Sequence, residues 1–169
     1  MKRIIFSSIL IASNLCLNAQ LLIGKETLNG ASTLLDFGDA PDNTRGIILP
    51  AVTSTDDVSP ANGNFVFDTH DNVVKVYENG LWKNLSEDGG TGNVISNPSA
   101  DTGEGVIIGD VVSSVDGILV LESPNMAMIL PKVAEPHLHV KSPYPGMMCY
   151  DTTNKALAVF DGSKWYYWN

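Results

Sequence analysis

The sequence predicts an all-β protein built from two tandem copies of a small antiparallel, hairpin-rich unit, with about six short strands in each copy. Three observations support this prediction. The apolar runs are short and are separated by turn-forming residues, which is typical of strands. No amphipathic helix of ordinary length stands out in the chain. Finally, four short sequence patterns occur twice, in the same order.

The longest of these patterns is an aromatic-tipped hairpin. The stretch VFDTHDNVVKVYENGLW (66–82) returns as CYDTTNKALAVFDGSKW (149–165), and its Asp-Thr pair and final Trp both recur after 83 residues. The residues that mark this repeat are Asp68, Thr69 and Trp82 in the first copy and Asp151, Thr152 and Trp165 in the second. Three shorter patterns also recur. LLIG (21–24) matches VIIG (106–109), Asn-Gly (29–30) matches Asp-Gly (116–117), and IILP (47–50) matches MILP (128–131). We therefore place the first unit at 20–86 and the second at 105–169.

Residues 1–19 have the layout of a secretory signal peptide. Lys2 and Arg3 precede an apolar run over 4–12 that is too short to span a bilayer. We expect cleavage after Ala19, and therefore a chain exported to the periplasm, the cell surface or the medium.

Within each unit, alternation of side chains predicts a strand that covers a core. In VVKVY (73–77) and ALAVF (156–160), every second residue is apolar in both copies, while the residue between them is Lys75 or Ala158. The first set should face inward, and the other face should tolerate polar groups. The strands before them, NFVF and MMCY, are continuous apolar runs, as expected of strands covered on both faces.

Turn residues predict where these strands end. Tight hairpin turns need positive φ angles, which Asn-Gly and Asp-Gly pairs supply readily. Proline ends a strand because it has no N–H for the ladder. The residues concerned are Asn79, Gly80, Asp161 and Gly162 for the turns, and Pro50 and Pro131 for the strand ends.

The segment 87–104 is rich in Gly, Ser, Asn and Asp and predicts a linker or a long exposed loop. Each unit beside it is small. A domain of about 65 residues buries only about 60% of its unfolded surface, so it is marginal alone without a disulfide or metal. Either the two copies pack on each other, or they pack on copies in other chains.

The charge of the chain excludes some partners. The net charge is −9, and removal of Lys2 and Arg3 with the signal gives −11. So acidic a surface repels phosphate backbones and anionic lipids, which argues against nucleic acid and membrane partners. After cleavage Cys149 is the remaining cysteine; it matches Val66 in the first copy, which indicates a buried, inert thiol.

Aromatic residues near the C-terminus are the candidate ligand-binding residues. Tyr166, Tyr167 and Trp168 could form a stacking platform for a glycan. Trp82 and Trp165 recur at the same place in both copies, which favours a packing role for them.

Acidic residues and histidines raise the question of a metal. Asp36, Asp39 and Asp42 are three residues apart in a Gly- and Pro-containing loop, and such oxygen ligands suit calcium. Turn formation by these acids is the alternative, and we expect no obligatory cofactor. His137 and His139 have a spacing that metals use, but no third ligand stands beside them except Glu135.

Catalytic constellations are not evident in the sequence. Asp68 and Asp71 could act as a carboxylate pair, but the second copy has Asn154 opposite Asp71. An Asp-Thr at a strand end more simply closes a turn by bonding its own backbone. We find no Ser/His/Asp set, phosphate loop or nucleotide fingerprint, so we do not predict an enzyme.

The ordered patterns LLIG, GIILP, NGNFVFDT and YENGLW, repeated as VIIG, MILP, PGMMCYDT and VFDGSKW, resemble a tandem β repeat of exported Bacteroidetes surface proteins. They are also similar to segments of phage tail-fibre-like and adhesin-like proteins. The resemblance spans both units. It implies an envelope or secreted β protein, trimeric in the manner of tail fibres, without an associated activity. One departure is that the Arg that usually follows the proline of this repeat is absent after Pro50 and Pro131.

Three functions follow as hypotheses. The first is a non-catalytic structural or adhesive surface module of a Gram-negative bacterium that associates with itself or with other envelope proteins. The second is a carbohydrate-binding module that uses the exposed aromatic residues near the C-terminus. The third, and weakest, is a glycan hydrolase with unidentified carboxylates.

Overall fold

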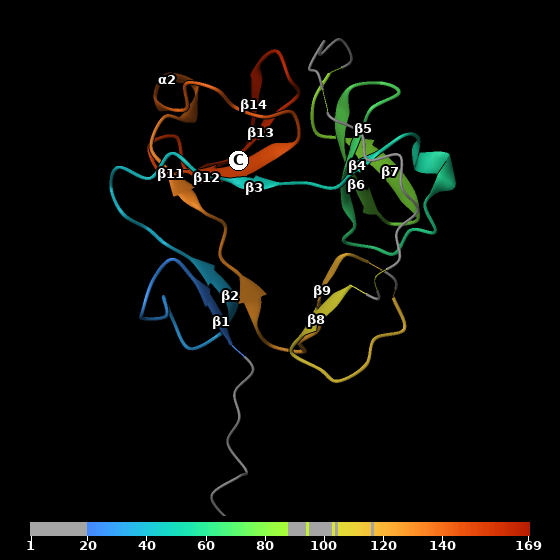
Figure 1. Cartoon of the computed structure of the whole chain (residues 1–169), viewed down its shortest axis with the longest axis horizontal. Coiled ribbons are helices and arrows are strands. Elements are labelled where there is room, and N and C mark those ends of the chain that lie inside the picture. The colour runs from blue at the N-terminus through green and yellow to red at the C-terminus, as the bar shows by residue number, and fades with distance from the viewer. Residues whose placement is uncertain (1–19, 88–93, 95–102, 104, 116) are drawn as a thin grey trace, which may run out of the picture.

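The computed structural model of the chain describes residues 20–87, 94, 103, 105–115 and 117–169, and this part is nearly all β (Figure 1). The expected signal peptide, 1–19, and most of the expected linker, 87–104, lie outside the described residues. Within the described part, no helix has the length and apolar character needed to cross a membrane.

Short strands make up both halves of the chain. The first half contains β1 (Leu21–Ile23), β2 (Thr33–Phe37), β3 (Ile47–Ile48), β4 (Ala51–Val52), β5 (Phe65–Asp68), β6 (Val73–Glu78) and β7 (Leu81–Asn84). The second half contains β8 (Val106–Ile108), β9 (Leu119–Leu121), β10 (Ala127–Met128), β11 (Lys132–Val133), β12 (Met147–Asp151), β13 (Ala156–Phe160) and β14 (Trp165–Trp168). A 3-10 turn, η1 (Thr55–Asp57), and a single helical turn, α2 (Pro136–His139), accompany them.

These strands form two hairpin sheets and two small sheets. The first hairpin sheet has the order β4-β5-β6-β7, and the second has the order β11-β12-β13-β14 with β3 added to β12. The first small sheet has the order β1-β2-β10, and the second contains β8 and β9. In Figure 1 the hairpin sheets lie side by side, and the small sheets lie below them.

Parallel pairing is as frequent as antiparallel pairing among these strands. Of the ten pairs in the described residues, five are parallel: β1-β2, β2-β10, β4-β5, β8-β9 and β11-β12. The predicted all-β class is confirmed, but the antiparallel description covers only the hairpins and the β3-β12 pair. The described residues of each half also hold seven strands instead of about six. The sequence pattern missed strands of two residues because so short a run carries no periodicity.

The turns of the hairpins follow the residue types. Asn79 and Gly80 have φ angles of 52° and 78° between β6 and β7, so the predicted Asn-Gly turn is confirmed. In the corresponding turn between β13 and β14, Gly162 has a positive φ, of 103°, but Asp161 does not. Asp161 instead accepts hydrogen bonds at Oδ1 from the N–H groups of Ser163 and Lys164, so its side chain closes the turn.

Two strands cross between the halves of the chain. Strand β3 of the first half pairs antiparallel with β12 of the second, and β10 of the second half pairs parallel with β2 of the first. Strand pairing therefore crosses between the two segments 20–86 and 105–169. The halves share strands.

The halves also share a core. Its buried members come from both hairpin sheets: Leu49, Phe67, Val74, Leu85, Met148 and Val159. This packing is the first of the two solutions expected for units of marginal size, in which the copies bury each other's apolar surface.

Candidate functional site

The aromatic strand β14 presents its side chains on two faces. Successive residues alternate, so Tyr166 and Trp168 share one face while Trp165 and Tyr167 share the other. Tyr166 packs against the shared core, and Trp165 packs against Val133, Cys149 and Ala158. The predicted trio of Tyr166, Tyr167 and Trp168 therefore does not form one flat platform.

Tyr167 and Trp168 remain the exposed members of this group, at 37% and 50%. The hydroxyl of Tyr167 lies 2.9 Å from Nδ1 of His137, and the two rings meet edge to face. Burial beside the negative charge of Asp151 raises the pKa of Tyr167. Trp168 donates from Nε1 to the backbone carbonyl of Leu85, at 2.8 Å, so it also joins the two halves.

A lysine occupies the space between two of the candidate calcium ligands. Nζ of Lys25 lies 3.0 Å from Oδ2 of Asp36 and 3.3 Å from Oδ2 of Asp39. Burial lowers the pKa of Lys25, but its hydrogen bonds to these two carboxylates outweigh that effect and raise it. Asp42 is exposed and takes no part in this pair of contacts. The structure does not bring the three acids together, and in the described residues no group of three His, Cys, Asp or Glu side chains could hold a metal.

The carboxylate pair Asp68 and Asp71 holds a buried lysine. Nζ of Lys75 lies 2.7 Å from Oδ2 of Asp68 and 2.5 Å from Oδ2 of Asp71. Burial raises the pKa of Asp68, but the hydrogen bond and charge of Lys75, together with the N–H groups of His70 and Thr55, outweigh burial and lower the pKa. Both carboxylates are therefore engaged with a cation instead of being poised as an acid and a base. The face of β6 expected to tolerate polarity buries its lysine because these acids neutralise it.

Asp151 is fully buried and closes a loop. Its Oδ1 accepts from the N–H groups of Thr153, Asn154 and Glu135, and its Oδ2 accepts from the side-chain amide of Asn154 at 2.7 Å. Burial raises its pKa, but these hydrogen bonds outweigh burial and lower it. The role is structural, because the carboxylate points into the fold.

Cys149 is fully buried in β12, beside Asp151. Burial and the nearby carboxylate raise the pKa of this thiol to about 12. A thiol in this state is protonated at neutral pH and is a poor nucleophile.

The two tryptophans that mark the repeat occupy similar places. Trp82 meets Tyr77 with ring centroids 5.2 Å apart, and Trp165 meets Phe160 at 5.4 Å. Both are half-buried. Each therefore packs across its own hairpin, as its recurrence in the sequence suggests.

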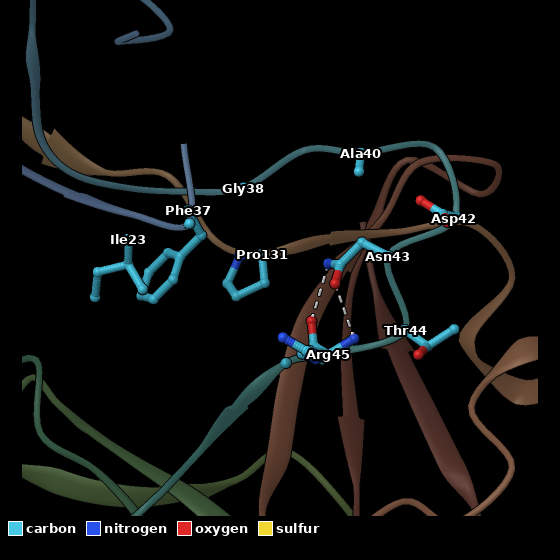
Figure 2. A pocket seen from close by; sticks show the side chains of 11 residues that line it. Ile23, Phe37, Gly38, Ala40, Asp42, Asn43, Thr44, Arg45 and Pro131 are labelled. Atoms are coloured by element: carbon cyan, nitrogen blue, oxygen red, sulfur yellow. Dashed lines mark hydrogen bonds between the residues drawn. The ribbon is translucent and has the colours of Figure 1, made fainter. Parts of the chain in front are cut away.

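A cleft of about 510 Å³ lies between the first small sheet and the loop that leads to β3. Figure 2 shows Ile23, Phe37 and Pro131 at one side of it and Asp42 and Thr44 at the other. At its floor, the side chain of Asn43 bonds the backbone of Arg45 in both directions, at 3.1 Å.

An apolar surface on the second small sheet was missed by sequence reasoning. Six apolar side chains of β8, β9 and the loops beside them are exposed: Val106 (56%), Ile107 (36%), Val111 (91%), Val112 (72%), Ile118 (62%) and Leu119 (48%). We call these six residues the β8-β9 apolar surface. The sequence showed apolar strands there, but whether another element covers them depends on tertiary structure.

Comparison with known proteins supplies no relative. No protein-family model, no curated protein and no solved structure matches the chain. Functional inference therefore depends on the residues and the geometry above.

Proposed function

We propose that the chain is a non-catalytic structural or adhesive module that is exported and associates with itself. The observation that carries this proposal is the β8-β9 apolar surface. A sheet of two short strands is marginal alone, and several exposed apolar side chains on one small sheet and its loops are typical of a protein interface. The titratable groups support a structural role, because Asp68, Lys75 and Asp151 are engaged in the fold.

The same proposal includes two tandem copies of one β unit. Its support is the repeated sequence order together with the matching strand order: each half runs from a parallel pair of short strands to an antiparallel hairpin sheet. The resemblance to tail-fibre-like and adhesin-like repeats would make the assembly a homotrimer at the surface of a Gram-negative bacterium.

Light scattering after size exclusion tests the self-association. The chain has a mass of 18.1 kDa. We expect a multiple of the single-chain mass, with a trimer as the leading expectation, and the same mass in EDTA because the described acids bind a lysine. A monomer at every concentration would refute the proposal. Export is tested separately by N-terminal sequencing of protein from the cell envelope or medium, which should begin at Gln20.

A second candidate function is carbohydrate binding at the C-terminal strand. The observation that favours it is the exposed pair Tyr167 and Trp168, because exposed aromatic faces stack on sugars. Trp168→Ala should abolish retention on a glycan array. It also removes the hydrogen bond to Leu85, so circular dichroism must show that the variant is folded, and Trp82→Ala serves as the matched control. If wild-type protein is retained on no glycan, this candidate is removed and the structural module remains.

A further inference from the structure

The two small sheets are built alike. In the first, Leu21 lies opposite Leu35, and in the second Val106 lies opposite Leu119. Both pairs run parallel, and both end in the same bond: Gly38 N–H to the carbonyl of Ile23, at 2.8 Å, and Glu122 N–H to the carbonyl of Ile108, at 2.9 Å. This register makes Leu34 and Leu35 the counterparts of Ile118 and Leu119.

Exposure separates these counterparts. Leu34 and Leu35 are 1% and 0% exposed, whereas Ile118 and Leu119 are 62% and 48% exposed. The surroundings of the two sheets also differ, because β10 pairs with the outer edge of β2, with Met128 opposite Leu35. No strand in the described residues pairs with the corresponding edge of β9.

A second segment of the chain has a sequence similar to that of β10 and the residues after it. IILP (47–50) contains β3 and matches MILP (128–131), so Ile47 is the counterpart of Met128. Met128 lies opposite Leu35 in the first small sheet. If the segment 47–50 paired with β9 in the same way, Ile47 would lie opposite Leu119. The vacant edge therefore has a matching strand in the same chain.

The edge of β3 that this pairing needs is free in the described residues. Successive N–H groups of a strand point to opposite edges. In β10, Ala127 and Ile129 donate to the first small sheet, to the carbonyls of Ser32 and Leu35. Their counterparts in the β3 segment are Gly46 and Ile48.

The opposite edge of β3 is already in use. Leu49 donates to the carbonyl of Gly146, beside β12, and β3 pairs with β12 on this side. Gly46 and Ile48 therefore point away from β12. Gly46 also lines the cleft, and Ile48 is 48% exposed, so this edge borders open space.

β3 does not reach β9 of its own chain. It is held on β12, where a Cβ on Gly46 would come within 2.6 Å of the carbonyl oxygen of Met148. In Figure 1, β8 and β9 lie well apart from β3. β10 is also not free for this role, because its required edge is paired with β2.

We propose that β3 of a second copy of this chain adds to the free edge of β9, in parallel, with Ile47 of one copy opposite Leu119 of the other. The added strand covers the edge of β9 as β10 covers the edge of β2, and it reduces the exposure of Ile118 and Leu119. This inference rests on the proposed self-association and names the strand, the partner edge and the register. It uses β-strand addition, in which backbone hydrogen bonds provide affinity and side chains select the register.

The first experiment introduces a charge at the proposed contact. Ile118→Asp should raise the dissociation constant of the assembly by about tenfold or more, because an unpaired carboxylate would be buried. Leu81→Asp is the matched control, since Leu81 is equally exposed (66%) but lies on β7. It should leave the oligomer unchanged. Circular dichroism and thermal melts of both variants establish that they remain folded.

The second experiment tests the register without a disruptive charge. Opposed residues in paired strands lie close enough for a disulfide, so Ile47→Cys with Leu119→Cys should give a reducible link between chains under mild oxidation. The control pair is Ile47→Cys with Leu81→Cys. The native Cys149 is buried and should not interfere.

The outcomes separate the two proposals. Both proposals are supported if Ile118→Asp loses assembly while Leu81→Asp keeps it, and if the 47/119 cysteine pair forms a link while the 47/81 pair does not. A stable oligomer that tolerates Ile118→Asp and forms no 47/119 link overturns this contact and leaves self-association standing. A wild-type chain that is monomeric at all concentrations overturns both.

Discussion

The two hairpin sheets bury an aspartate at the same place and neutralise it differently. Asp68 ends β5 beside Val52 of β4, and Asp151 ends β12 beside Val133 of β11. Each accepts the N–H two residues later at 2.9 Å, from His70 and from Thr153. The two aspartates differ in the groups that donate to their other carboxylate oxygens.

In the first sheet a cation supplies the compensation, and in the second amide groups supply it. Lys75 reaches Asp68, while its counterpart in β13 is Ala158. Asn154 replaces Asp71 and donates its side-chain amide to Asp151. The comparison teaches that the turn-closing carboxylate is common to both sheets, while the means of satisfying its charge depends on two neighbouring residues.

Removal of the carboxylate beside the lysine should have the largest effect. Asp68→Ala leaves Lys75 buried with only the half-exposed Asp71, and should lower the free energy of unfolding by about 3 kcal/mol. Urea denaturation measures this change. Asp71→Ala is the control and should cost less than about 1 kcal/mol, because Asp71 is 44% exposed. Equal losses in both variants would show that the buried ion pair is not what distinguishes the first sheet.

Removal of the Asp151 carboxylate, which amide groups satisfy, should lower the free energy of unfolding by somewhat less. Asp151→Ala deprives the N–H groups of Thr153, Asn154 and Glu135 of their acceptor, with an expected loss of about 2 kcal/mol. Thr153 and Asn154 are exposed, so water can replace part of what is lost. Asp151→Asn keeps one acceptor oxygen and should recover part of the loss in the same urea experiment. No recovery would mean that the negative charge itself is required.

Transfer of one arrangement into the other sheet tests the comparison directly. Lys75→Ala with Asp71→Asn places the residues of the second sheet around Asp68. The double variant should be more stable than Lys75→Ala by about 1 kcal/mol, because the new amide can donate to Asp68 as Asn154 donates to Asp151. A double-mutant cycle of unfolding free energies measures this coupling. Additive losses would contradict the equivalence of the two solutions.

Protonation of Asp68 and Asp151 in acid should lower the stability of the fold by a similar amount for each sheet, and by less than the substitutions above. The pKa values of Asp68 and Asp151 are lowered in the folded chain, so their stabilisation is fully present above the unfolded pKa of about 3.9. It is lost as the pH falls through the lower folded pKa. Thermal melts from neutral pH down to acid should show the decline below about pH 4. Asp68→Asn and Asp151→Asn should each flatten it in part, and unchanged profiles would show that neither carboxylate is responsible.

Much of the local structure could be predicted from the sequence, and part of the candidate site could not. The hairpins followed from alternating side chains and from Asn79-Gly80, and burial of Cys149 followed from its match with Val66. The acidic loop was misleading, because Lys25 approaches Asp36 from another turn of the chain and occupies the place expected for a cation. A contact between residues distant in sequence has no signature in a single chain.

The sequence by itself determined the longer strands of the two hairpins and the places where they turn, because these depend on neighbours within a few residues. Only the tertiary structure decided that β3 joins β12, that β10 joins β2 and that no strand of the described residues joins the outer edge of β9. The physical reason is that strands of two residues have apolar side chains suited to several edges. Their partner is chosen by where the rest of the chain holds them and by close contacts such as Gly46 on Met148.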